Sequence, residues 1–197
     1  MRGRFLQILE TPGVHASRQA AYGRTRPTPP AGAAAGLTDE EIGFIRARDS
    51  FYIASISESG WPYIQHRGGP AGFLRVVDDR HLAFADFSGN RQLLTTGNIQ
   101  HESRVCLFLM DYGARERLKI LARASLCGAD DERLAGLPLP DGGRVERGFV
   151  LEIEGYDWNC PKYITPRYTR SEIESVLNPL QERIHELENQ LRTKNTA

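Results

Sequence analysis

The stretch FYIASISESGWPYIQH, residues 51–66, contains two runs of β-branched and aromatic residues separated by the turn sequence ESG at 58–60. Residues of these types favour β-strands, and the Ser-Gly pair favours a reversal of the chain between them. We therefore predict a β-hairpin here.

The same pattern continues as far as residue 156. Further strands are predicted from FLRVV (73–77), HLAFADF (81–87), VCLFLM (105–110), LKILARASL (118–126) and FVLEIEGY (149–156). Seven short strands within about 105 residues, with only brief helical interruptions, indicate an antiparallel barrel or sandwich. They argue against a doubly wound parallel sheet.

Two short helices are predicted beside these strands. Thr38 and Glu41 stand at the spacing of a capping box, so a helix should begin at residue 38. In the segment 88–103, Leu93 and Leu94 are expected to anchor a second helix that begins near Gly89.

Both ends of the chain have a different composition. Residues 1–36 are predicted to be an arm with a short helical piece around 14–22, followed by a Pro-, Gly- and Ala-rich linker or strap. We expect a central domain at 37–168 and a helical extension at 169–197.

The C-terminal extension carries a heptad pattern. A capping box is expected at Ser171 and Glu174, and Pro179 should kink the helix or restart it at Asn178. This helix is predicted to pack on its own barrel or on a partner subunit. Its apolar residues follow a 4-3-4-3-4 spacing: Ile173, Leu177, Leu180, Ile184, Leu187 and Leu191.

Charge and composition exclude several classes of function. The 25 basic and 25 acidic residues balance, so neither nucleic acid nor a membrane surface is an expected partner. We find no apolar stretch of membrane-spanning or signal-peptide length and expect a cytoplasmic protein. The three cysteines are widely spaced and the five histidines are scattered, so neither a disulfide framework nor a metal site is predicted.

Three segments could bind a ligand, and each also has a purely structural interpretation. QHRGGPAGF (65–73) combines glycines with an arginine fork suited to phosphate, or is a solvated hairpin. SGNR (88–91) could present helix amides to an anion, or is an ordinary capped turn. WNCPKYI (158–164) offers aromatic faces and a lysine, or closes the end of the barrel, with Cys160 favoured as an unreactive thiol.

Together, HRGGPAGFLRVVDD, FADFSGNRQ and NCPKYI resemble the FMN-binding split-barrel superfamily. This is the pyridoxamine 5′-phosphate oxidase-like group, and the resemblance, which covers about residues 38–168, is to its predicted flavin-nucleotide-binding branch. It implies a mainly β fold, a six- to seven-stranded antiparallel split barrel with peripheral helices, and a homodimer with FMN at the interface.

The resemblance also implies the residues that contact the cofactor. His66, Arg67, Gly68 and Gly69 would lie along the flavin. The ribityl chain and ring would run beside Ala85, Asp86 and Phe87, and the phosphate would meet Asn90 and Arg91. From the partner subunit would come Trp158, Asn159, Cys160 and Lys162.

The chain departs from the vitamin B6 oxidase itself, because NCPKYITPRY stands where that enzyme has an Arg-x-His substrate motif. No side chain is a convincing acid or base, so catalytic residues are not assigned. The resemblance favours an FMN-dependent oxidoreductase that acts on a small molecule. A flavin or haem carrier or sensor, and an interaction protein that uses its C-terminal heptads, are the alternatives.

Overall fold

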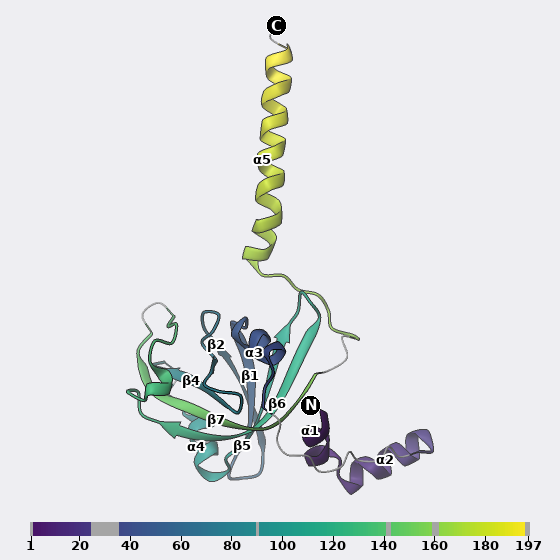
Figure 1. Cartoon of the computed structure of the whole chain (residues 1–197), viewed down its shortest axis with the longest axis vertical. Coiled ribbons are helices and arrows are strands. Elements are labelled where there is room, and N and C mark those ends of the chain that lie inside the picture. The colour runs from purple at the N-terminus through teal and green to yellow at the C-terminus, as the bar shows by residue number, and fades with distance from the viewer. Residues whose placement is uncertain (1, 25–35, 90, 141–142, 159–161, 196–197) are drawn as a thin grey trace.

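One antiparallel sheet forms the centre of the molecule (Figure 1). The computed structural model describes residues 2–24, 36–89, 91–140, 143–158 and 162–195. Seven strands pair in the order β2-β1-β5-β6-β7-β4-β3, which confirms the predicted fold class. The strands are β1 (Ser50–Ile56), β2 (Pro62–Gly68), β3 (Arg75–Val76), β4 (His81–Phe87), β5 (Arg104–Asp111), β6 (Glu116–Cys127) and β7 (Val145–Trp158).

Alternation along the strands builds the core. In β1, Phe51 and Ile53 are buried while Tyr52 and Ile56 are exposed, as the period of two requires. The rings of Phe84 and Phe149 stack at 4.7 Å between neighbouring strands β4 and β7. Phe51 meets Phe84 edge-on at 5.2 Å. These contacts fill the inside of the curled sheet with aromatic side chains.

The curl brings the two edges of the sheet together. Strand β2 is one edge, whereas β4 is next to the other edge, yet Arg67 Nη1 of β2 donates to Asp86 Oδ1 of β4 at 2.6 Å. This ion pair therefore spans the split between strands that share no backbone hydrogen bonds.

The N-terminal arm is more ordered than its sequence indicated. A helix at 2–9, α1 (Arg2–Leu9), was not predicted, and α2 (Pro12–Tyr22) covers the predicted helical piece. Phe5 is buried. A Cβ on Gly155 of β7 would lie only 2.9 Å from the backbone nitrogen of Phe5. The close approach of α1 to β7 thus depends on a glycine in the strand.

Helix α3 (Asp39–Arg46) has the predicted capping box at Thr38 and Glu41. The predicted start of α4 (Leu94–His101) near Gly89 was wrong, because Leu93 adopts a left-handed conformation immediately before Leu94. Nor do Leu93 and Leu94 anchor this helix, since both are exposed. A short helix, η1 (Glu132–Leu134), covers the outside of β4.

Helix α5 (Arg170–Asn195) rises away from the barrel as a long rod (Figure 1). It runs through Pro179 without restarting, and its capping box is formed by Thr169 and Glu172 instead of Ser171 and Glu174. The heptad side chains are exposed, so they do not pack on the chain's own barrel. The other predicted alternative, packing on a partner subunit, stays a prediction. Within the described residues, no helix is both long and apolar enough to cross a membrane.

Candidate functional site

The split between β2 and β4 contains a cluster of three charged side chains, of which Asp86 is buried and Arg67 and Arg147 are half-buried. Arg67 donates to one oxygen of Asp86, and Nη1 of Arg147, on β7, lies 3.8 Å from the other. The side chains of Arg67 and Asp86 are only 16% and 12% exposed. Arg147 Nη2 also pairs with Glu146 at 3.1 Å, so two carboxylates balance the two guanidinium groups. What suits an anionic ligand is the hydrogen-bonding capacity that Arg67 retains.

Aromatic rings hold the Arg67 guanidinium from beneath. Its carbon atom Cζ lies 5.4 Å from the ring centroid of Phe149 and 5.7 Å from that of Phe84. Cation–π attraction and the Asp86 ion pair fix the orientation of the fork. Even so, Nε of Arg67 is buried without a hydrogen-bond partner.

Helix α4 faces this cluster with polar side chains. Thr95 Oγ1 donates to Gln65 Oε1 at 2.6 Å, and Asn98 Nδ2 donates to Ser55 Oγ at 2.9 Å. These bonds dock the helix on β1 and β2. The hydroxyl of Thr96 is buried without a hydrogen-bond partner, as is Arg67 Nε. An unmet buried hydroxyl costs stability, so it marks a place where a ligand atom could bind.

A small polar pocket lies among these groups. It has a volume of about 70 Å³, and its lining includes Arg67, Asp86, Thr95 and Thr96. Whole small-molecule sites usually span roughly 300–1,000 Å³. The pocket therefore has room for one polar group of a ligand, with the rest of that ligand outside it.

A larger hollow of about 670 Å³ shares part of its lining with the small pocket, and the shared residues are 92–94. Among these, Leu93 has φ +53° and ψ +25°, a conformation that β-carbon sterics disfavour in every residue except glycine. Strain of this kind costs about 1–3 kcal/mol and is concentrated at ligand-binding sites.

Of the predicted residues His66, Arg67, Gly68 and Gly69, only Arg67 lines the small pocket. Because side chains alternate along β2, His66 lies on the face opposite Arg67, and its ring meets that of Tyr52. A Cβ on Gly69 would lie 2.8 Å from the Phe73 ring, and one on Gly68 would lie 3.1 Å from the His66 ring. Both glycines thus accommodate neighbouring side chains of the chain itself.

The predicted residues of β4 divide between two environments. Asp86 and Phe87 line the small pocket. Ala85 instead belongs to an apolar cluster with Leu134 and Leu137, on the side of β4 that η1 covers, and Phe87 also packs against this cluster. Arg91 is exposed beside Gln92, a pocket residue, but it does not stand at a helix N-terminus as predicted.

The predicted aromatic tail lies at the other end of β7. Trp158 Nε1 donates to Glu41 Oε1 at 2.6 Å, and the Trp158 ring meets Phe44 edge-on at 4.8 Å. Lys162 stands 5.1 Å over the ring of Tyr163. Arg147 and Trp158 lie near opposite ends of the same strand, so one chain does not bring this tail to the Arg67 cluster. The predicted contacts of Asn90, Asn159 and Cys160 fall outside the described residues.

Sequence reasoning missed Arg147 and Thr96. Arg147 was inconspicuous because only the register of β4 with β7, which pairs it with Asp86, places it in the cluster. A signal for Thr96 existed in the run Thr95-Thr96-Gly97-Asn98, whose small polar side chains fit a helix docked on a sheet through hydrogen bonds.

The two cysteines that the structure describes do not extend this site. Both Cys106 and Cys127 are free thiols. Burial raises the pKa of Cys106, and burial together with the Asp131 charge raises the pKa of Cys127. Neither is therefore primed as a thiolate. Within the described residues, His, Cys, Asp and Glu form no cluster suited to a metal ion.

Comparison with known proteins assigns the family. Residues 37–147 match the family model described as pyridoxamine 5′-phosphate oxidase. The match spans more than half of the chain, and the chain belongs to the pyridoxamine 5′-phosphate oxidase family. The search among curated proteins returned no match.

Solved structures with a similar fold share little sequence with this chain. A Lactobacillus delbrueckii protein provisionally described as a pyridoxamine 5′-phosphate oxidase is 23% identical, with 62% of this chain and 93% of that one covered and a TM-score of 0.48. An FMN-binding protein from Syntrophomonas wolfei is 12% identical, with 61% and 87% covered and a TM-score of 0.44.

Proposed function

We propose that this protein is a flavoprotein that binds FMN noncovalently and catalyses redox chemistry on a small molecule. The observation that carries the proposal is the small polar pocket in the split, where Arg67 Nε and Thr96 Oγ1 are buried without partners. Family membership supports a flavin as the ligand.

The residues of the pocket fit a phosphate group. Arg67 supplies a guanidinium whose Nε has no partner, and the Thr96 hydroxyl supplies a further donor. Arg91 would add an exposed cation from the rim. Because the Arg67 fork is already held by Asp86 and two aromatic rings, little side-chain entropy is lost when the ligand binds.

We further propose that a second copy completes the site. Trp158 and Lys162 lie away from the Arg67 cluster of their own chain, so they could meet a ligand there only across an interface. The outward faces of β1 and β2 carry Tyr52, Ile56 and Ile64, which are 37–62% exposed. An apolar sheet face of this kind fits a homodimer interface.

When bound, FMN would supply the two-electron chemistry, and the protein would bind and orient it. Arg67 holds the charged end in the split, and the strained Leu93 places apolar side chains at the rim. The electron donor and acceptor would be small molecules.

Titration of the flavin-free protein with FMN tests this proposal. Loss of an Arg–phosphate contact costs about 1.5–3 kcal/mol, or roughly tenfold to more than a hundredfold in affinity. Arg67→Ala should show that loss. Arg104→Ala is the matched control, because Arg104 is exposed and pairs with Glu102 outside the split. Equal affinities in the two variants would contradict the site.

Catalysis is tested separately from binding. Stopped-flow reduction of the FMN-loaded protein by NADH or NADPH, followed by reoxidation with a panel of acceptors, should exceed the rates of free FMN. Binding without such turnover would leave a flavin carrier in place of an oxidoreductase.

A further inference from the structure

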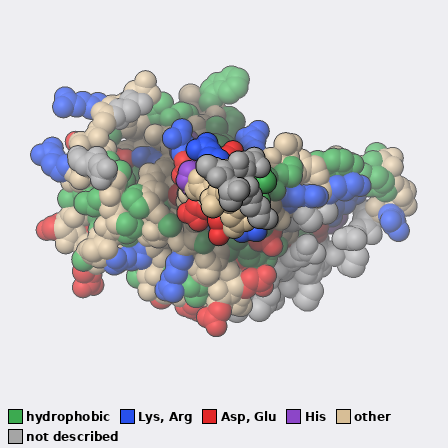
Figure 2. Space-filling view, turned by 90° about the horizontal axis from the view of Figure 1, so that it is seen from above, with side chains coloured by type: hydrophobic (Ala, Val, Ile, Leu, Met, Phe, Trp, Pro, Cys, Tyr) green, Lys and Arg blue, Asp and Glu red, His purple; other side chains and the backbone are tan. Residues whose placement is uncertain are grey.

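Helix α5 presents an apolar stripe that no other described part of the chain covers. The six heptad side chains Ile173, Leu177, Leu180, Ile184, Leu187 and Leu191 are 41–61% exposed. Figure 1 shows the helix standing clear of the sheet, and Figure 2, viewed from above, shows charged side chains of both signs around it. A continuous stripe of this kind is unfavourable in water unless another surface covers it.

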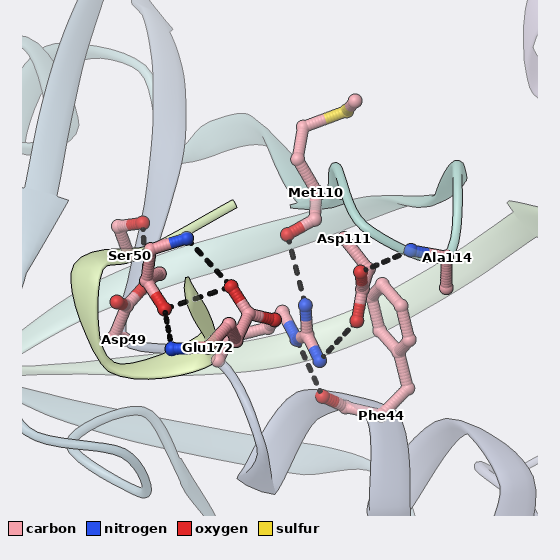
Figure 3. A network of polar contacts seen from close by, with 9 residues as sticks. Phe44, Asp49, Ser50, Met110, Asp111, Ala114 and Glu172 are labelled. Carbon is pink, nitrogen blue, oxygen red and sulfur yellow. Dashed lines mark hydrogen bonds and ion pairs between the residues drawn. The ribbon is translucent and has the colours of Figure 1, made fainter. Parts of the chain in front are cut away.

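A capping box closes the first turn of α5. Thr169 donates from its backbone nitrogen and its hydroxyl to Glu172 Oε2, at 2.6 and 2.7 Å. A polar network of the barrel lies near this cap (Figure 3). In it, Arg48 donates to the carbonyl oxygens of Phe44 and Met110 and forms an ion pair with Asp111.

The heptad register places Pro179 outside the apolar stripe. With Leu180 and Leu187 at d and Leu177 and Ile184 at a, Pro179 falls at position c, on the outer side of the helix. The Pro179 ring therefore lies away from the apolar seam, and the helix continues through it.

The charged residues beside the apolar seam favour a parallel second copy of α5 over an antiparallel one. In a parallel, in-register pair, Arg183 at position g faces Glu188 at position e of the second copy, and symmetry makes two such pairs. In an antiparallel pair, Arg183 would face its own equivalent and Glu174 would face Glu188. A parallel copy therefore gains attraction where an antiparallel copy meets repulsion.

We propose that α5 pairs with α5 of a second copy of this chain as a parallel, in-register, two-stranded coiled coil. The β-branched Ile184 at position a, between Leu180 and Leu187 at d, favours two strands over three or four. This interface is separate from the flavin site and does not depend on it.

Disulfide cross-linking of the full-length chain tests the pairing. Leu187→Cys places a thiol on the seam, whereas Glu182→Cys places one on the outer face as a matched control; the wild-type chain controls for the native cysteines. In a glutathione buffer, L187C should form a reducible dimer at least about tenfold faster than E182C, because the seam gives a high effective concentration.

Orientation is tested by exchanging the charges in the L187C background. Arg183→Glu should slow cross-linking by about threefold to tenfold, and Arg183→Glu with Glu188→Lys should restore it. Equal rates for L187C and E182C would overturn the coiled coil, and failure of the double exchange to restore the rate would overturn its parallel register. Because the rates are measured with and without FMN, this outcome is separate from that of the flavin proposal.

Discussion

Two buried carboxylates, Glu41 and Asp86, lie near opposite ends of β7. They differ in whether the groups around them have all their hydrogen-bond partners. Glu41 Oε2 accepts from the backbone and hydroxyl of Thr38, and Oε1 accepts from Trp158. Asp86 is held by Arg67 and Arg147. At Glu41 the partners form a closed set, whereas at Asp86 the partner Arg67 keeps a buried donor without an acceptor.

This difference separates stability from binding. The closed set of charge-assisted bonds ties α3 to the end of the sheet and leaves no oxygen of Glu41 for a ligand. The set around Asp86 is incomplete, which costs stability and leaves a donor for an anionic ligand. Substitution of Glu41 should therefore change mainly stability as long as the Trp158 ring stays packed on Phe44, while substitutions at the Asp86 end should change binding.

The largest effect on stability is expected for Glu41→Ala. This change leaves the indole N–H of Trp158 and the backbone N–H of Thr38 without their charged acceptor, at a cost of about 3 kcal/mol. The melting temperature should fall by roughly 6–12 °C. FMN affinity per folded molecule should stay within about twofold. A large loss of affinity measured below the transition would show that the two ends are coupled.

Thr96→Val and Thr95→Val should have opposite effects on the flavin-free protein. Thr96→Val removes a buried hydroxyl without a partner, so it should stabilise by about 1 kcal/mol while weakening FMN binding about fivefold. Thr95→Val breaks the bond to Gln65 and should destabilise by a similar amount. Chemical denaturation and FMN titration of both variants measure these effects.

The Glu41 carboxylate should also affect how the free energy of unfolding falls at acid pH. Burial alone would raise the pKa of Glu41, but hydrogen bonds from Thr38 and Trp158 outweigh it and hold the pKa below the usual 4.5. The stability from this group is thus complete above about pH 4.5 and is lost as pH falls through the lowered value. Glu41→Gln should flatten the curve there, and an unchanged acid limb would contradict this assignment.

The smallest effect is expected for Arg91→Ala. An exposed cation at the rim contributes at most about 1 kcal/mol to phosphate binding, so affinity should fall no more than about fivefold, and less at high salt. FMN titrations at two salt concentrations measure this. A loss as large as that of Arg67→Ala would move the centre of the phosphate site from the split to the 88–91 turn.

The strands and the cap of α3 were predictable because their signals are local. The alternation at 51–66 and the Thr38–Glu41 spacing each depend on neighbouring residues. The starts of α4 and α5 were not predicted correctly, since the left-handed Leu93 and the choice of Thr169 over Ser171 depend on how each helix meets the barrel.

The site was predictable only in part for the same reason. Arg67 and Asp86 stood out in motifs, but their contact depends on the curl that joins β2 to β4. Arg147 enters through strand register, which local sequence does not give, and Thr96 enters through helix docking, for which the small polar run 95–98 was the only local signal.

The central claim is that the Arg67 cluster binds the phosphate of FMN. Its most direct test compares the Kd of FMN with that of riboflavin, which lacks the phosphate, in the wild-type protein and in Arg67→Ala. We predict that the wild type prefers FMN by at least about tenfold and that Arg67→Ala loses most of this preference. Equal affinity of the wild type for both flavins, or a preference that survives in Arg67→Ala, would contradict the account.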